Sequence, residues 1–473
     1  MGYGERLDGE YCLRRPLVAI NEQYYWGKEF LYIEINPKEH TLTLQRDALC
    51  ILPIFLAEDS RHIVLHSDFA CAVASLNQKE LVADRLCVIQ YLIGSWTHRR
   101  TLIQQVQTIY DRARIEIKGM ELRIINPPDS CIGTLLKKRT SNPYEFRARL
   151  DAVLEIYKKR YAPSNKIQCM LSGGCDSSTI AGYYAHTGMK VHGVTLGYPG
   201  SFRESQQSKL RDLEATFGVR SVTYPLRSYA DYPFAHAAHI PNWKPFYHRI
   251  DPYSRTINDI LYHGTEEGLT VQFNGLGGDE LFENVRLKHL RSKSDEVQLD
   301  GLLPTFTTAC FRRMFQASKA ALLQEYTPIP LQAYSMTNYG ACMTNGYFDY
   351  NIWPVAPLGD PELYAYCQGL PAVYKKNKTI LRAYLEAAGF PKSVYQPKHN
   401  EHFLPFLQAA SRNKLAPHLK RLLNSSVLAE SGLIRPAQVV EQLDKPDTDQ
   451  ALVATLLLLV VEANLQALHI TSF

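Results

Sequence analysis

The sequence predicts an α/β protein with a β-rich N-terminal domain, a parallel sheet and a helical C-terminal layer. Residues 1–135 alternate short β-forming stretches with turns. From Tyr144 to Asn274, apolar strands alternate with amphipathic helices, which is typical of a parallel sheet covered on both faces. After about Val285 strand-forming stretches fade and helical periodicity dominates. Because 473 residues are too many for one ordinary core, we expect domains at 1–135 and 144–473, joined by a linker at 136–143.

In the N-terminal domain, three stretches alternate or cluster β-forming residues between turn residues, and a fourth has helical periodicity. The predicted strands are Phe30–Ile35, His40–Gln45 and Arg61–His66, and the predicted helix is Leu81–Ile93. The stretch Lys137–Pro143 is polar and basic and ends in a proline, so we expect it to be an exposed linker.

The second domain begins with a regular alternation of predicted elements. Its predicted strands are Lys166–Leu171, Val191–Leu196, Val219–Tyr224 and Thr270–Asn274. Its predicted helices are Tyr144–Arg160, Ser177–His186, Glu204–Phe217, Thr256–Glu267, Lys378–Ala388 and Asp449–Leu468. The aromatic-rich stretch Tyr347–Trp353 is interpreted as packing rather than as a substrate platform.

Composition and charge argue against two classes of partner. The net charge is +5 without a dense block of Lys or Arg, so nucleic acid is not an expected partner. The longest apolar run, Ala451–Val461, is too short to cross a bilayer, and we interpret it as a buried helix. The ten cysteines form no CxxC pair, and the first residues lack an apolar signal core. We therefore expect a cytoplasmic protein with free thiols and no membrane association.

The strongest motif for chemistry lies between the predicted strand that ends at Leu171 and the helix that follows. A helix N-terminus offers free N–H groups to a polyphosphate, and glycines allow close approach of the backbone. Serine hydroxyls add donors, and an aspartate can hold Mg²⁺ through oxygen. The alternative is an ordinary tight turn between a strand and a helix. The residues expected to bind a nucleotide here are Leu171, Ser172, Gly173, Gly174, Asp176 and Ser177.

A second glycine-rich segment, Asn274–Phe282, also follows a predicted strand. In open α/β sheets, ligands bind beyond the carboxyl ends of the strands, so the two segments are expected to converge. Asn274 and Gly275 are candidate nucleotide contacts, and Asp279 supplies a second carboxylate for a metal. A purely structural glycine turn remains open for this segment when it is taken alone.

At these residues the sequence resembles the asparagine synthetase superfamily, which includes β-lactam synthetases and lasso-peptide cyclases. The segment Ser172–Ser177 is similar to the family's PP-loop, so the resemblance implies an adenine nucleotide α-hydrolase-like domain that uses ATP and Mg²⁺. It further implies that Leu196 contacts adenine. The segments Pro357–Leu363, Lys378–Arg382 and Pro397–Lys398 resemble later family motifs. By this resemblance Lys378 binds the nucleotide, Asp176 and Asp279 hold the metal, and Lys398 stabilises charge during catalysis.

The N-terminal domain resembles the glutaminase-type domain that precedes the synthetase in this family. Three short segments carry the similarity: Arg46–Leu49, Pro53–Phe55 and Val64–Asp68. The family's nucleophile is an N-terminal cysteine, whereas residue 2 is Gly2 and Cys12 has no free α-amine to act as its base. We therefore expect a degenerate glutaminase-like domain that makes no ammonia.

A further departure lies at Leu276, where asparagine synthetases carry Glu and β-lactam synthetases carry Tyr. Leucine cannot accept a proton, so the base for the incoming amine must come from elsewhere or from the substrate. His399 and His402 are candidates, although a surface or core role is the alternative. Neither family activity therefore transfers directly.

The resemblance implies an AMP-forming carbon–nitrogen ligase acting through an acyl-adenylate. A lasso-peptide-like macrolactam synthesis is the expected reaction, on a peptide or small molecule that carries a carboxylate and an amine, with a biosynthetic peptidase as a candidate partner. An intermolecular amide ligase and an ammonia-using amidating enzyme remain as alternatives. Two further hypotheses are a PP-loop enzyme that acts on RNA and a degenerate ATP-binding regulatory protein.

Overall fold

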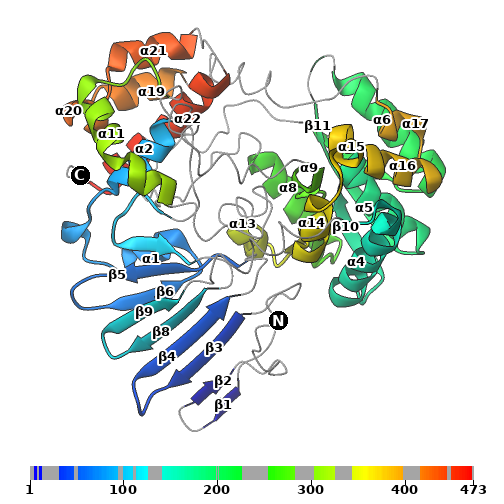
Figure 1. Cartoon of the computed structure of the whole chain (residues 1–473), viewed down its shortest axis with the longest axis horizontal. Helices are drawn as coiled ribbons and strands as arrows, with labels where there is room; N and C mark the ends of the chain where they lie inside the picture. Colours follow the sequence, from blue (N-terminus) through cyan, green and yellow to red (C-terminus); the bar gives the residue numbers. More distant parts are fainter. Residues whose placement is uncertain are drawn as a thin grey trace.

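The computed structural model shows an α/β protein, as the sequence predicts (Figure 1). It describes residues 5–7, 10–12, 31–46, 52–93, 100–109, 113–125, 141–198, 200, 202–225, 254–282, 303–324, 344–397, 416–444 and 449–470. Within these residues, two antiparallel sheets belong to the N-terminal region and one parallel sheet to the region after residue 141.

The N-terminal region packs a six-stranded sheet against a three-stranded one. Apolar residues from both, such as Leu44, Leu56 and Ile115, share one core. The buried guanidinium of Arg46 donates to the carbonyls of Leu52 and Ile109 and so fixes two connections to this core. The larger sheet has the order β1 (Glu5–Leu7), β2 (Glu10–Cys12), β3 (Leu31–Asn36), β4 (Thr41–Arg46), β8 (Arg114–Lys118), β9 (Glu121–Ile125); the smaller has the order β6 (Ile63–His66), β5 (Phe55–Glu58), β7 (Val106–Thr108).

The parallel sheet has five strands in the order β12, β11, β10, β13, β14, and every pairing in it is parallel. The chain builds outward from β10 to β12 on one side and then crosses to β13 and β14 on the other. The strand order therefore reverses between β10 and β13, and at such a switch point α/β sheets bind ligands. The strands are β10 (Lys166–Met170), β11 (Lys190–Gly197), β12 (Ser221–Pro225), β13 (Val271–Phe273) and β14 (Trp353–Val355).

Helices cover both faces of this sheet. On one face, strand residues such as Ile167 and Cys169 pack against helices from three parts of the chain. On the other face, alternate residues such as Val194 and Leu196 meet the apolar side of α8 (Ser254–Glu266) and Tyr347 of α13 (Thr344–Asp349). The helices of the first face are α4 (Phe146–Tyr161), α5 (Cys175–His186), α6 (Phe202–Phe217), α14 (Pro361–Gln368), α16 (Thr379–Ala387) and α17 (Lys392–Tyr395).

The last helices pack on the N-terminal region rather than on the parallel sheet (Figure 1). One core joins α1 (Phe69–Ala74) and α2 (Arg85–Leu92) to the later helices, so the hydrophobic core crosses the boundary expected at 136–143. The long helix among them is buried along its described side chains from Leu457 to Leu465, which agrees with the buried helix predicted there. These helices are α11 (Ala309–Gln324), α19 (Ala416–Leu423), α20 (Val427–Glu430), α21 (Pro436–Asp444) and α22 (Asp449–Ala467).

Two expectations from the sequence need correction. The strand β14 was not predicted, because it has only three residues and contains Pro354, which cannot donate to a ladder. It occupies the edge of the sheet, where proline is tolerated. Within the predicted exposed linker, Asn142 is exposed as expected, but Ser141 is buried and its hydroxyl donates to the Tyr366 carbonyl over 2.7 Å. Among the residues described, no helix is both long and apolar enough to cross a membrane.

Candidate active site

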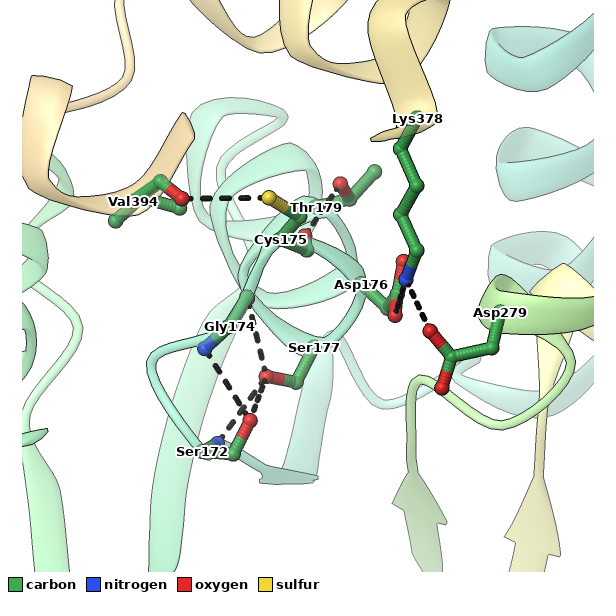
Figure 2. Close-up of polar contacts among 9 residues, drawn as sticks. All are labelled: Ser172, Gly174, Cys175, Asp176, Ser177, Thr179, Asp279, Lys378 and Val394. Carbon is green, nitrogen blue, oxygen red and sulfur yellow. Dashed lines mark hydrogen bonds and ion pairs between the residues drawn. The ribbon is translucent and has the colours of Figure 1, made fainter. Parts of the chain in front are cut away.

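The turn after β10 is a compact, hydrogen-bonded loop at the switch point of the sheet. The Ser177 hydroxyl accepts from the Ser172 backbone N–H over 3.1 Å and lies 3.0 Å from the Ser172 hydroxyl (Figure 2). The Ser172 hydroxyl also accepts from the Gly174 N–H over 3.2 Å. Gly173 has φ +82°, a conformation that glycine adopts readily. The two serines therefore fix the shape of the turn before any ligand arrives.

The turn leads into the N-terminus of α5. Gly174 is the N-cap and has no side chain to satisfy the first N–H groups of this helix. The side chains that follow are Cys175, whose thiol donates to the Val394 carbonyl over 3.3 Å, and Asp176 in the first turn. A 12-residue helix whose N-terminus is left uncapped beside a tight glycine turn is suited to an anion such as a phosphate.

The turn after β13 lies directly against the start of α5. A Cβ added at Gly275 would lie 2.7 Å from the Ser177 nitrogen, and one at Gly278 would lie 2.4 Å from Cγ of Asp176. Both distances are too short for any side chain, so glycine is required for the two turns to meet. The Asn274 side chain holds this turn, accepting from the Leu276 N–H over 3.0 Å. The convergence that the sequence predicts for the two segments is thus present in the structure.

A lysine joins the two segments. The Lys378 ammonium lies 2.5 Å from Oδ2 of Asp176 and 2.6 Å from Oδ1 of Asp279, which belongs to α9 (Gly278–Phe282) (Figure 2). Asp176 and Lys378 are largely buried, whereas the Asp279 side chain is 77% exposed. Three segments far apart in the sequence thus place two carboxylates around one cation.

The backbone around Lys378 is unusual. Lys378 and the preceding Asn377 both have left-handed conformations, with φ +56° and +52°. Such conformations cost roughly 1–2 kcal/mol for each non-glycine residue and persist only where packing enforces them. They occur in the short helical turn Lys376–Lys378, immediately before α16. We interpret them as the local geometry that directs the Lys378 side chain toward the two carboxylates.

The carboxylates fit a magnesium ion. Burial raises the pKa of Asp176 to about 6, against the lowering effect of the Lys378 charge. In the described part of the chain, the buried Oδ1 of Asp176 and Nδ2 of Asn274 have no hydrogen-bond partner. Carboxylate oxygens are the ligands that Mg²⁺ prefers, and a divalent cation would compensate a buried negative charge. Asp176 and Asp279 are therefore suitable magnesium ligands. When no metal is bound, the Lys378 ammonium supplies the positive charge beside the two carboxylates.

Comparison with known families finds one family whose model matches most of the chain. The family described as Asparagine synthase matches residues 150–336 and 355–470, more than half of the chain. The chain belongs to the asparagine synthase family. Membership indicates an ATP-dependent ligase that forms amide bonds. Compared with individual curated proteins, the chain has no match.

The family box Pro357–Leu363 also reaches the site. Gly277, at φ +88°, lies so close to Gly359 that an added Cβ would be 2.7 Å from its Cα. The next residue, Asp360, is the N-cap of α14 and accepts from the N–H groups of Glu362 and Leu363. Burial raises the pKa of Asp360 to about 6. This segment therefore packs directly against the turn after β13.

Other residues singled out in the sequence have different outcomes. Leu196 lies at the end of β11, buried in the core that faces α8. Leu276 packs against Ala356 and the same core, so its apolar side chain lies among hydrophobic residues. Lys398, His399 and His402 lie outside the described residues.

A second cluster of possible metal ligands is excluded by its hydrogen bonds. His66, Asp68 and Cys71 bring their ligand atoms within 4.8 Å of one another, the only such group in the described part of the chain. However, Nδ1 of His66 accepts from the Asp68 N–H over 2.8 Å. A neutral imidazole has one lone pair, so the observed ring has none left for a metal. This cluster is instead the start of α1, which Asp68 caps.

Two residues of the site were not singled out from the sequence. Gly278 belongs to the predicted segment, but its contact with Asp176 joins parts of the chain about 100 residues apart. Gln206 is fully buried in α6 and hydrogen bonds to both β10 and β11 ends. The sequence does indicate Gln206 as unusual, because it shares a helical face with Leu210 and Leu213 and is therefore a polar residue in an apolar stripe.

Proposed function

We propose that this asparagine synthase-family enzyme activates a carboxylate with ATP as an acyl-adenylate and then forms a lactam within the same substrate. The observation that supports this most is the meeting of three segments at the switch point of the sheet. There, Asp176 and Asp279 both lie within 2.6 Å of the Lys378 ammonium, beside an uncapped helix N-terminus.

The first half-reaction is an attack by a carboxylate oxygen of the substrate on the α-phosphorus of ATP. The bond to the β-phosphate breaks and pyrophosphate leaves. In this proposal the turn from Ser172 to Ser177 and the N-terminus of α5 receive the phosphates, and Leu196 lies along the adenine. A magnesium ion bound to Asp176 and Asp279 would neutralise phosphate charge.

The second half-reaction is the attack of a substrate amine on the acyl carbon, which releases AMP and forms the amide. Lys398 is proposed to stabilise the negative charge that develops at this stage. The apolar Leu276 cannot take the proton that the amine loses, so another group or the substrate itself accepts it. Holding amine and acyl-adenylate in one molecule favours ring closure over hydrolysis.

The test incubates the full chain, ATP and Mg²⁺ with linear peptides that carry a free carboxylate and a free amine. We expect AMP and pyrophosphate in equal amounts, and a peptide product lighter by the mass of one water. Stoichiometric ADP and phosphate would contradict adenylation. If AMP forms but the product contains a separate second amine molecule, the enzyme is an intermolecular amide ligase and not a lactam-forming enzyme.

The oxygen balance offers an independent check. If the substrate carboxylate carries ¹⁸O, one labelled oxygen should appear in AMP, because the carboxylate oxygen that attacks phosphorus leaves with it. Label found in pyrophosphate, or unlabelled AMP beside a labelled amide, would contradict an acyl-adenylate.

A further inference from the structure

Gln206 joins the two ends of the proposed nucleotide site. Its side-chain oxygen accepts from the Tyr198 N–H over 3.0 Å, and its side-chain nitrogen donates to the Leu196 carbonyl over 3.0 Å. The same nitrogen lies 3.4 Å from the Ser172 carbonyl, a longer contact to the turn after β10. One amide therefore contacts the ends of two neighbouring strands.

These partners determine which way the amide faces. Two carbonyls must meet the NH₂ group and one N–H must meet the oxygen, so only one orientation satisfies all three contacts. Gln206 is fully buried, where a lost hydrogen bond is not replaced by water. The amide is therefore fixed in position by its partners.

The helix that carries Gln206 also contacts the first turn directly. A Cβ added at Gly173 would lie 3.1 Å from Cβ of Lys209 and 3.8 Å from the Gln206 carbonyl oxygen. Both loops therefore rest on the same stretch of α6. A shift of this helix would move the turn at Ser172 and the segment Leu196–Tyr198 together.

We infer that Gln206 is a positioning residue that sets the distance between the phosphate-binding turn and the adenine-binding segment, so that ATP meets both at once. The inference rests on the proposed nucleotide site. A ligand that spans both loops gains from their fixed separation, whereas a fragment that touches one loop does not. The advantage is that of two linked fragments binding to preorganised subsites.

The experiment compares Gln206→Met with wild type in the full chain, by calorimetric titration with ATP, adenosine and pyrophosphate, each with Mg²⁺. Methionine is similar in length but makes none of the three hydrogen bonds. We expect ATP affinity to fall by about tenfold or more, with adenosine and pyrophosphate each within about threefold of wild type. A residue needed only for folding would not separate ATP from its fragments.

The matched control is Gln207→Met, on the same helix. The Gln207 side chain donates to the Thr223 hydroxyl of β12 over 3.0 Å, and not to the Leu196 carbonyl or the Ser172 carbonyl that Gln206 contacts. All three affinities should remain within about threefold of wild type. Equal losses in the two variants would overturn the assignment to Gln206.

Hydrogen exchange tests the inference without any nucleotide. Gln206→Met should lower the protection of the segment 196–198 and of the turn 172–174 together, while Gln207→Met leaves both unchanged. If the wild-type protein binds no ATP but Gln206→Met still lowers the hydrogen-exchange protection of both segments, the proposed function is wrong. The connection of the two segments through Gln206 is then still supported.

Three results would overturn the inference: unchanged ATP affinity in Gln206→Met, an equal loss for adenosine and ATP, or protection lost in one loop only. If Gln206→Met does not fold, Gln206→Asn is used instead, because its shorter side chain cannot reach both strand ends. If neither variant folds, Gln206 is required for the fold and the positioning role is rejected.

Discussion

The Lys378 ammonium lies 2.5 Å from a carboxylate oxygen of Asp176, although 202 residues separate the two in the sequence. Both side chains are about one-fifth exposed, so the pair is poorly screened by solvent. The Lys378 charge opposes the rise that burial imposes on the pKa of Asp176, and the Asp279 charge adds to that rise. Lys378 thus offsets a repulsion between two carboxylates that the fold brings together.

Replacing this lysine should leave a buried carboxylate without its cation. For Lys378→Met, we expect a loss of unfolding free energy of about 1–3 kcal/mol at pH 7.5, where Asp176 is ionised. The double variant Lys378→Met/Asp176→Asn should lose less than the sum of the single variants, because the unpaired charge is gone. Urea unfolding of the three variants measures this coupling. Additivity within about 0.5 kcal/mol would contradict a direct interaction.

The carboxylates themselves should matter for turnover. Asp176→Asn and Asp279→Asn each remove a negative charge from the proposed magnesium site, and we expect losses of at least ~10²-fold at saturating ATP and Mg²⁺. The control is Glu362→Gln, which makes the same change of charge at an exposed position of α14. Rates near wild type for both aspartate variants, in a product assay for AMP, would contradict the metal assignment.

Close packing of the two turns predicts a steric effect at Gly278. In Gly278→Ala the new Cβ would lie 2.4 Å from Cγ of Asp176, so the Asp176 side chain must move. We expect at least a tenfold loss of turnover and about 1–3 kcal/mol of stability. Gly346→Ala is the control, because an added Cβ there has no atom within 4 Å and a helical alanine is favoured. Equal activity of the two variants would show that the turns separate easily.

Lys398 remains a prediction from the sequence, with one structural support. The Cys175 thiol at the start of α5 donates to the carbonyl of Val394, and Lys398 follows four residues later. The described chain that leads toward Lys398 therefore passes the phosphate-binding turn at Val394. Lys398→Met should lower the single-turnover rate by about two decades with ATP affinity nearly unchanged.

The exposed Lys392, at the start of α17, provides the comparison for Lys398. Lys392→Met should alter neither the rate nor the affinity, because surface substitutions rarely exceed ~0.5 kcal/mol. If Lys398→Met abolishes ATP binding while bound ATP still reacts at the normal rate, Lys398 is a binding residue and not a catalytic one.

The sequence predicts most of the parallel sheet and both glycine turns, because each depends on local pattern. A strand, a glycine turn and a helix are adjacent in the chain, so their order alone places Ser172 and Asn274 at the same edge of the sheet. The packing of α22 against α2 is different, since it joins residues more than 350 positions apart. Such a contact depends on the complete fold and leaves no local signal.

The site shows the same division. The strand–turn–helix pattern predicts that Asp176 and Asp279 converge, whereas the left-handed backbone at Asn377 and Lys378 does not follow from its residues. Lysine disfavours that conformation, so only the surrounding packing can impose it. Lys378 could be identified by resemblance, but its contact with both carboxylates required the structure.

Burial of Asp360 predicts a pH dependence of stability. Its folded pKa is raised to about 6 from the ordinary value of 3.8, so the fold favours the protonated acid. The stabilising contribution is therefore present below about pH 4 and is lost as pH rises through 6. Asparagine is also a good N-cap and carries no charge. Asp360→Asn should match wild type at low pH and exceed it by on the order of 2–3 kcal/mol above pH 7.

A second buried N-cap aspartate makes this prediction specific to Asp360. Asp84 caps α2 through the Cys87 N–H, but it also pairs with Arg100 over 2.8 Å. Asp84→Asn keeps the cap and removes the partner of a guanidinium, so it should destabilise the fold by on the order of 1 kcal/mol at pH 7.5. The two substitutions should therefore have opposite signs at that pH. Denaturant unfolding between pH 4.5 and 8 measures the unfolding free energy of both variants. If Asp360→Asn is less stable than wild type at pH 8, the contacts of the Asp360 carboxylate stabilise the fold by more than its burial costs.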